Sequence, residues 1–321
     1  MTTQDRPRVA IPAAAAAGFE DLWASGEHPP EMIIGPVESA RDLAVLTEGC
    51  DVLVIAGEVL TPPYVRGIAP SVRLIARLGV GVDNIDFAAV RERRLPVLIQ
   101  PTYASREVAS HAVALLLAVN RRIVAFDRFA RDGWTGRYPL PPLPALAEMV
   151  VGLVGAGAIG RWVSAFLSPM VAEVIVHDPG LAEPPPGTAR LVGLDEIYRL
   201  SDAVSLHLPL TDQTRHFLGR AEFARMRREA VLINVSRGAL VDEAALADAL
   251  ASGTIAGAGL DAFEHEPLPR DSPLRSAPNV ILSPHAAWYS GRSREQLILG
   301  TMADIDSFLA SGSVRSGRLI G

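Results

Sequence analysis

The sequence predicts an α/β protein of two domains, each built on a parallel β-sheet. Short apolar runs alternate with helical patterns over almost the whole chain, which is typical of successive βαβ units. The length of 321 residues suits two domains of roughly 100–200 residues each. Hydrophobic residues make up 49% of the chain, yet no uncharged apolar run is long enough to span a membrane.

The first third of the chain contains a series of predicted strands, separated by turns rich in glycine and proline. These strands are predicted at residues 8–11, 32–35, 51–56, 74–77 and 96–99. The alanine-rich N-terminal stretch lacks a leucine-rich core and soon meets Glu20 and Asp21. We therefore interpret it as a strand followed by a helix, rather than as a signal peptide.

Residues 103–131 are predicted to form one long helix, of which residues 112–119 are apolar on every face. Such a helix must be buried between layers or in a subunit interface. A loop rich in Gly, Trp and Pro follows, and then a second α/β series begins. Its six strands are predicted at residues 150–154, 173–177, 203–207, 231–235, 257–261 and 280–282. A final helix, predicted over 292–309, can pack back on the first domain.

The composition excludes several kinds of chemistry. All 30 basic residues are arginine, so the chain can form no lysine Schiff base, pyridoxal phosphate anchor or Walker A loop. The single cysteine, Cys50, excludes an internal disulfide and a cysteine-rich metal site, and it favours a reduced, cytoplasmic location. The net charge of -6 and the scattered arginines do not favour nucleic acid. We expect neither a nucleic-acid nor a membrane partner.

Residues 150–160 combine an apolar strand with the pattern G-x-G-x-x-G, at the point where a helix begins. Gly155 permits the tight turn, Gly157 lets a pyrophosphate approach the backbone, and Gly160 lets the helix pack on the sheet. The N–H groups that begin this helix would face the phosphates. Asp178, after the next strand, can accept hydrogen bonds from ribose hydroxyls and repel a 2′-phosphate. The pattern therefore predicts NAD as the cofactor.

Three polar side chains follow later strands of the second series, namely Arg237, Glu266 and His285. Hydride transfer to or from a 2-hydroxy acid needs a base for the hydroxyl proton and a cation for the carboxylate. A guanidinium can hold a carboxylate through two hydrogen bonds, and a glutamate beside a histidine fixes the imidazole tautomer. Because parallel strands end at one sheet edge, these side chains are expected to cluster. Singly, they could be a surface ion pair, a surface acid and a capping residue.

The other histidines carry weaker signals. His207 ends a predicted strand and is expected to shape the cofactor pocket. His28, His111, His177 and His216 show no partner and are interpreted as structural. Histidine pairs with the spacing of a metal site are absent from the sequence, so no metal is predicted.

Taken together, several motifs resemble the D-isomer-specific 2-hydroxyacid dehydrogenase family. The matching stretches follow the family order at residues 79–86, 155–178, 207–211, 233–238, 259–267 and 283–285. The resemblance implies two doubly wound parallel-sheet domains. A Rossmann cofactor domain at 103–284 would be inserted in a discontinuous, flavodoxin-like substrate domain at 1–102 and 285–321.

The resemblance also implies residue roles. His285 would be the acid/base, Glu266 its partner and Arg237 the substrate anchor, while Val80 and Gly81 would offer backbone N–H groups to the substrate carboxylate. The helix over 103–125 would lie in a homodimer interface. The cofactor would contact Gly155, Gly157, Ala158, Ile159, Gly160, Asp178, His207, Pro209, Thr214, Val235, Ser236 and Asp261.

Residues 284–290 resemble the C-terminal-binding-protein branch of the family more specifically. In that branch a tryptophan three residues after the histidine lines the substrate pocket, and an arginine before the glycine loop meets the carboxylate. Trp288 and Arg77 match these positions, with a core tryptophan and an edge-strand arginine as the alternatives. The chain departs from the family pattern at residues 100–103, at Ser110 and at residues 147–150.

These features predict an NAD-dependent enzyme that interconverts a 2-oxo acid and a D-2-hydroxy acid by hydride transfer. An NAD-sensing, corepressor-like binding module is the alternative from another class, but all three catalytic candidates are present. Phosphite oxidation is a further alternative, whereas the presence of Glu266 argues against formate oxidation. Trp288 favours a bulky or thioether-bearing 2-oxo acid.

Overall fold

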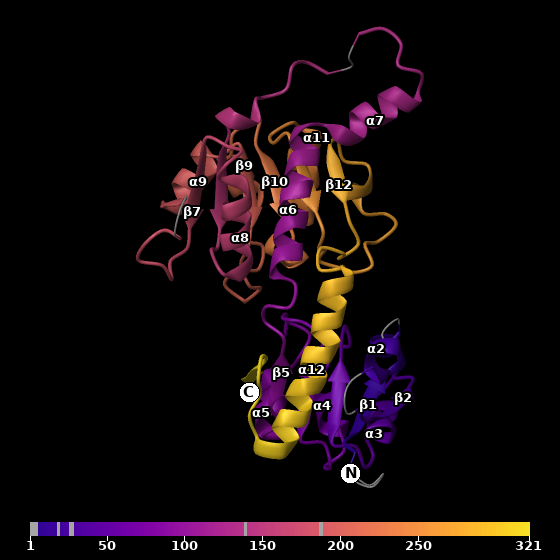
Figure 1. The fold of residues 1–321 in the computed structure, drawn as a ribbon. Coiled ribbons are helices and arrows are strands. Elements are labelled where there is room, and N and C mark those ends of the chain that lie inside the picture. The colour runs from indigo at the N-terminus through magenta and orange to yellow at the C-terminus, as the bar shows by residue number, and fades with distance from the viewer. Residues whose placement is uncertain (1–5, 18–19, 26–28, 138–139, 186–188) are drawn as a thin grey trace. The chain divides into compact units, whose positions relative to one another are not determined.

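The computed structural model describes residues 6–17, 20–25, 29–137, 140–185 and 189–321 (Figure 1). The chain divides into two compact units. The first unit comprises Met1–Tyr103 and Ser290–Gly321, and the second comprises Ala104–Tyr289. The second unit thus extends to Tyr289, whereas the resemblance places this boundary at residues 284/285.

The first unit contains a six-stranded sheet of order β13-β5-β4-β3-β1-β2. The strands are β1 (Arg8–Pro12), β2 (Glu31–Gly35), β3 (Val52–Ile55), β4 (Leu74–Arg77), β5 (Val97–Ile99) and β13 (Arg318–Ile320). β13 runs antiparallel to β5, and the other pairings are parallel. The order β2-β1-β3-β4-β5 is the flavodoxin-like arrangement. The helices are α1 (Ala13–Ala16), α2 (Glu20–Ala24), α3 (Ala40–Leu46), α4 (Pro62–Gly67), α5 (Phe87–Glu92) and α12 (Gly291–Ser311).

The second unit contains a seven-stranded parallel sheet of order β12-β11-β10-β9-β6-β7-β8. The strands are β6 (Val150–Val154), β7 (Glu173–His177), β8 (Ala189–Leu191), β9 (Ala203–Leu206), β10 (Val231–Asn234), β11 (Gly257–Leu260) and β12 (Val280–Leu282). The strand order reverses beside β6, as in the Rossmann fold. The predicted doubly wound architecture is confirmed. The strand missing from the six predicted ones is β8, an edge strand of three residues that is too short to give a pattern in the sequence.

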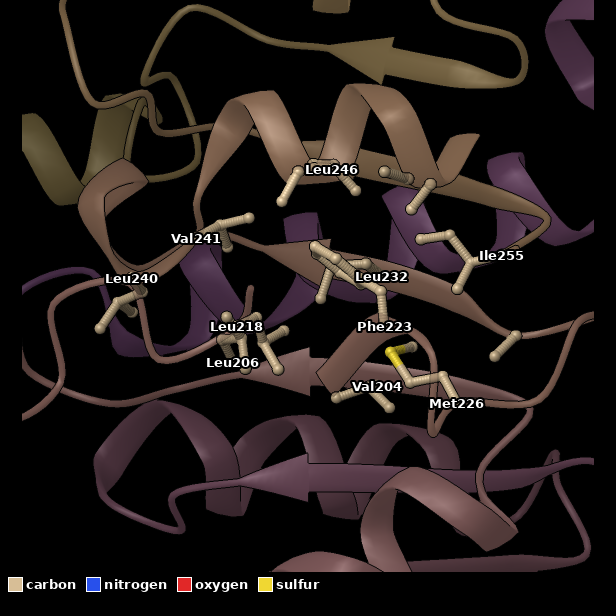
Figure 2. Packing of buried hydrophobic residues seen from close by; sticks show 14 of the residues in the cluster. Val204, Leu206, Leu218, Phe223, Met226, Leu232, Leu240, Val241, Leu246 and Ile255 are labelled. Atoms are coloured by element: carbon tan, nitrogen blue, oxygen red, sulfur yellow. The ribbon is translucent and has the colours of Figure 1, made fainter. Parts of the chain in front are cut away.

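Helices cover both faces of the second sheet. The helices are α6 (Ser105–Asn120), α7 (Ile123–Arg131), α8 (Ala158–Leu167), α9 (Leu194–Leu200), α10 (Arg220–Phe223) and α11 (Glu243–Ala251). α6 and α8 pack on one face. α9, α10 and α11 pack on the other, where Phe223, Leu232 and Leu246 point into one buried cluster (Figure 2). These two apolar layers hold the strand ends in place.

The predicted single helix over 103–131 is wrong, because the chain bends by 58° between α6 and α7. Arg122 adopts a left-handed φ of 52°, which interrupts the helical hydrogen bonds after Asn120. α6 is buried along the sheet, whereas α7 has no buried residue and extends away from the sheet of its unit (Figure 1). Among the described residues, no single helix is both long and apolar enough to cross a membrane; α6 and α7 pass that test only when taken together.

Candidate functional site

A glycine turn joins β6 to α8, where the sequence predicts the nucleotide site. Gly155 has φ +94°, and a Cβ there would lie 2.5 Å from the carbonyl oxygen of His207. A Cβ on Gly160 would collide with the carbonyl oxygen of Gly155. A Cβ on Gly157 would meet no atom within 4 Å, and no side chain caps the first turn of α8. The turn is therefore an open cradle of the kind that fits a pyrophosphate.

Asp178 follows β7 and is fixed beside this turn. Its Oδ2 accepts a hydrogen bond from the Ala156 N–H (2.8 Å), and its Oδ1 accepts one from the Gly180 N–H (2.9 Å). The Nε of Arg161 donates to the carbonyl oxygen of Ala156 (3.0 Å). The predicted ribose-binding carboxylate and the arginine of α8 thus both brace the glycine turn.

His207 follows β9 and contacts the same turn from the neighbouring strand. Burial lowers the pKa of His207 to about 4, so the ring is neutral at physiological pH. Its Nε2 lies 3.0 Å from the hydroxyl of Ser205. In the loop that follows, the Thr214 hydroxyl donates to the carbonyl oxygen of Pro209 (2.8 Å). A neutral ring in this position can shape a pocket wall, which is the role predicted for His207.

Arg237 lies in a tight turn after β10. The buried Asn234 orders this turn, since its Oδ1 accepts from the Ser236 N–H (3.0 Å) and its Nδ2 donates to the Arg237 carbonyl oxygen (2.8 Å). The Ser236 hydroxyl donates to the Leu206 carbonyl oxygen (2.8 Å), which ties the turn to β9. Val235 is buried within the turn. Sequence reasoning did not assign a role to Asn234, although it lies within the matched stretch 233–238.

The turn of Arg237 packs directly against the loop that carries Glu266. A Cβ on Gly238 would overlap the backbone of Phe263. The Phe263 N–H in turn donates to Oε1 of Glu266 (2.9 Å). Backbone contact at a glycine thus couples the positions of two predicted catalytic side chains from separate strand ends.

Glu266 and His285 form a hydrogen-bonded pair, with 2.8 Å between Glu266 Oε2 and His285 Nδ1. A carboxylate can only accept, so Nδ1 carries a proton and Nε2 is left for another partner. Burial alone would raise the pKa of Glu266, but its hydrogen bonds from His285 and Phe263, with the charges of His285 and Arg237, lower it overall. Glu266 is therefore ionised at neutral pH. The predicted cluster of Arg237, Glu266 and His285 exists in the second unit.

The backbone of His285 is left-handed, with φ +52°, a conformation that costs on the order of 1–2 kcal/mol. Asp261, after β11, holds this turn with both its backbone and its side chain. The His285 N–H donates to the Asp261 carbonyl oxygen (2.8 Å). The Asp261 carboxylate, 1% exposed, accepts from the Ser283 hydroxyl (2.6 Å), the Ala286 N–H (2.9 Å) and the Ala287 N–H (2.8 Å). The predicted cofactor residue Asp261 thus already binds the turn that carries His285.

Three of the predicted substrate residues belong to the first unit. Arg77 ends β4, and its guanidinium lies so close to Gly79 that a Cβ there would collide with it. Gly79 has φ +135°, which favours glycine at this position. Val80 is 46% exposed and Gly81 is half-buried, so this part of the loop after β4 is accessible to solvent.

Trp288 belongs to the second unit and is half-buried. Its ring packs edge-on against that of Tyr289, with 5.5 Å between the centroids. Because Trp288 is not part of the buried core, the alternative of a core tryptophan does not hold.

The interpretation that the remaining histidines lack partners is wrong for three of them. His111 Nε2 lies 2.9 Å from Ser283 Oγ, His177 Nδ1 lies 3.1 Å from the Val192 carbonyl oxygen, and His216 Nε2 lies 3.1 Å from Glu264 Oε1. These partners are 172, 15 and 48 residues apart along the chain, so no local pattern announces them. His28 lies outside the described residues.

Known proteins are similar to this chain in sequence and in fold. The model for "D-isomer specific 2-hydroxyacid dehydrogenase, NAD binding domain" matches residues 113–287. A glyoxylate reductase of Korarchaeum cryptofilum is 38% identical over 86% of this chain and 82% of its own. A glycerate dehydrogenase of Methylorubrum extorquens is 35% identical over 75% of this chain and 77% of its own.

A solved structure is similar over nearly the whole chain. It is the NADPH-dependent glyoxylate/hydroxypyruvate reductase of Sinorhizobium meliloti in complex with NADP and malonate, with a TM-score of 0.87 and 29% identity over 98% of this chain and 97% of its own. These similar proteins are enzymes, which does not favour the alternative of an NAD-sensing module. The chain is an NAD-dependent oxidoreductase that interconverts a 2-oxo acid and a D-2-hydroxy acid. It belongs to the D-isomer specific 2-hydroxyacid dehydrogenase family.

Proposed function

We propose that His285 is the acid/base of this reaction, Glu266 its partner and Arg237 the anchor for the substrate. The observation that carries the proposal is the 2.8 Å hydrogen bond between Glu266 and His285 Nδ1. This bond orients the ring and leaves Nε2 to exchange a proton with the substrate oxygen. The charge of Arg237 acts on Glu266, so the cation belongs to the same cluster.

The protein groups divide the work of the reduction between them. The His285 imidazolium would donate its Nε2 proton to the carbonyl oxygen of the 2-oxo acid, and the Glu266 carboxylate would stabilise the imidazolium before that transfer. The guanidinium of Arg237 would hold the substrate carboxylate and stabilise the charge that develops on the oxygen. NAD, when bound, supplies or accepts the hydride. In the opposite direction, neutral His285 would take the hydroxyl proton.

The cofactor would lie along the strand ends of the second unit. The open backbone at Gly157 and the uncapped start of α8 fit its pyrophosphate. Ala158 and Ile159 form the first turn of that helix. Asp178 would meet the adenosine ribose, and its negative charge favours NAD over a cofactor with a 2′-phosphate. The remaining proposed contacts are His207, Pro209, Thr214, Val235, Ser236 and Asp261.

We further propose a small 2-oxo acid such as glyoxylate or hydroxypyruvate as the substrate. Support comes from the glyoxylate reductase and glycerate dehydrogenase relatives. Val80 and Gly81 would offer backbone N–H groups to its carboxylate. Arg77 and Trp288 would each contact the substrate, the roles that the resemblance to the C-terminal-binding-protein branch implies for them. If Trp288 selects a bulkier side chain, longer 2-oxo acids will react faster than glyoxylate.

The test is a panel of 2-oxo acids assayed by the loss of NADH absorbance, repeated with NADPH. His285→Ala is expected to abolish turnover while NADH still binds, as measured by quenching of tryptophan fluorescence. His265→Ala is the matched control, since His265 is exposed and lies one residue from Glu266. Turnover that survives in His285→Ala would overturn the assignment.

A homodimer is also proposed. α7 leaves Ile123 54% and Val124 38% exposed, and Trp134 beyond it is 66% exposed. Such an apolar arm favours burial against a second copy of the chain. Ile123→Asp is expected to lower the mass in solution, measured by light scattering, to that of one chain. A cytoplasmic location accords with the single, buried and unpaired Cys50.

A further inference from the structure

A second histidine lies beside the turn that carries His285. His111, on α6, places its Nε2 2.9 Å from the hydroxyl of Ser283 and 3.5 Å from Oδ1 of Asp261. The Ser283 hydroxyl lies 2.6 Å from the same Oδ1. His111, Ser283 and Asp261 therefore form one polar network, which we call the Asp261 network. The described hydrogen bonds of these three residues do not involve the Nε2 atom of His285.

The direction of the hydrogen bonds in the Asp261 network follows from its chemistry. A carboxylate only accepts, so the single hydroxyl hydrogen of Ser283 is donated to Asp261. Ser283 Oγ must then accept from its other neighbour, which means that Nε2 of His111 carries a hydrogen. The chain of donation runs from His111 to Ser283 to Asp261. A group at position 111 that cannot donate would break it.

The network ends on the backbone that holds His285. Besides Ser283, the Asp261 carboxylate accepts from the N–H groups of Ala286 and Ala287, and the Asp261 carbonyl oxygen accepts from the His285 N–H. Three successive N–H groups are thus bound by one residue. Because φ at His285 is +52°, these bonds must hold a conformation that the free chain would leave. Rotation of the Asp261 carboxylate would break its bonds to the N–H groups of Ala286 and Ala287, the two residues that follow His285.

The packing of α6 brings His111 to this place. Leu115, one helical turn after His111, lies so close to β11 that a Cβ on Gly259 would sit 2.9 Å from its Cβ. Gly259 precedes Asp261 by two residues on the same strand. The absence of a side chain at Gly259 therefore allows the helix to approach the strand end where the network forms.

We propose that His111 is a positioning residue for the reaction, which acts through Ser283 and Asp261 to hold His285 in its left-handed turn. The inference rests on the proposed role of His285. In a site of this kind, displacing a catalytic group by about 1 Å costs up to ~100-fold in rate, so loss of the His111 hydrogen bond should lower kcat. The affinity for NADH should change little.

The experiment compares His111→Phe and Ser283→Ala with the full-length wild-type chain in NADH-dependent glyoxylate reduction. Each variant is expected to lower kcat at least about tenfold while the Kd for NADH and the thermal midpoint stay close to the wild-type values. His111→Gln keeps a donor near the Nε2 position and Ser283→Thr keeps the hydroxyl, so both should restore most of the rate. The double variant should match the single ones, since either change breaks the same chain.

Ser110→Ala is the control, because the Ser110 hydroxyl is bonded only to the Glu107 carbonyl oxygen in the described structure. If His111→Phe and Ser283→Ala both keep kcat within twofold of the wild type while His285→Ala is inactive, the inference is wrong and the proposed function stands. Equal losses of NADH affinity and kcat would also overturn it. Turnover in His285→Ala would instead remove the proposed function on which it rests.

Discussion

Replacement of Asp304 by asparagine tests how the C-terminal strand is held in the first unit. Asp304 is fully buried on α12. Its Oδ1 accepts from the N–H groups of Arg315 (2.6 Å) and Ser316 (2.9 Å). Its Oδ2 accepts from Gln100 Nε2 (2.8 Å), the Ser316 hydroxyl (3.1 Å) and the Gly317 N–H (2.8 Å). One carboxylate thus ties α12 to Gln100, the residue that follows β5, and to the segment that leads into β13.

The expected loss of stability follows from this set of donors. Asparagine has one acceptor oxygen, so its amide group must replace Oδ1 or Oδ2. The Gln100 amide can flip and the Ser316 hydroxyl can rotate, but in either orientation at least one backbone N–H keeps no acceptor. A buried donor without a partner costs about 1–3 kcal/mol, and the remaining hydrogen bonds become weaker because their acceptor is a neutral amide and no longer a carboxylate. We expect Asp304→Asn to lower the free energy of unfolding of the first unit by about 2–4 kcal/mol.

The stability that Asp304→Asn removes should depend on pH. Burial alone would raise the pKa of Asp304, but the hydrogen bonds from Gln100 and residues 315–317 lower it overall. A folded-state pKa below the unfolded value gives stability that is complete above the unfolded pKa, about 3.9 for aspartate. This stability disappears as the pH falls through the folded pKa. The difference between wild type and variant should therefore be constant near neutrality and narrow below about pH 4.

The assay is urea unfolding combined with hydrogen exchange of the amides in β13, with Glu295→Gln as the control. Glu295 lies on the same helix but is exposed. Asp304→Asn should lower the urea midpoint and accelerate exchange in β13, because the strand loses its anchor. An unchanged midpoint together with unchanged protection of β13 would refute this reasoning.

Three further predictions concern the second unit. Gly155→Ala should weaken NADH binding at least about tenfold, because φ at Gly155 is +94° and a Cβ there would approach the His207 carbonyl oxygen. A fluorescence titration measures the Kd for NADH, and an unchanged Kd would contradict the prediction. Asp178→Ala should reduce the ratio of NADPH to NADH dissociation constants by removing the charge that opposes a 2′-phosphate, and an unaltered ratio would count against that role. Gly238→Ala should lower kcat by displacing Phe263 and the loop beyond it, with NADH affinity retained as the internal check.

Local signals in the sequence were sufficient to predict two α/β domains on parallel sheets, whereas the doubly wound order and the discontinuous first domain were expected from the family resemblance. Alternating apolar runs and helical patterns located the main strands of both sheets, and the spacing of the glycines located the turn after β6. The stretches around Arg237, Glu266 and His285 each follow a strand, and parallel strands end at a common edge. Their clustering could therefore be predicted without coordinates.

Other features depend on contacts between distant segments. β13 has only three residues, too few to show the alternation of apolar and polar side chains that predicts a strand. It pairs with β5, and the preceding residues 315–317 are held by hydrogen bonds to Asp304. The bend at Arg122 occurs where helical propensity continues, and none of the residues of α7 beyond it is fully buried in the described structure.

The partner of His111 is the clearest case. Ser283 lies 172 residues away, and the two meet because Gly259 lets α6 approach β11. The sequence by itself determined the fold, the glycine turn and the strand-end residues, since each is encoded within a few residues. Only the tertiary structure decided which buried polar groups hold His285 in place, because a hydrogen bond a few ångströms long is set by how helix and sheet pack.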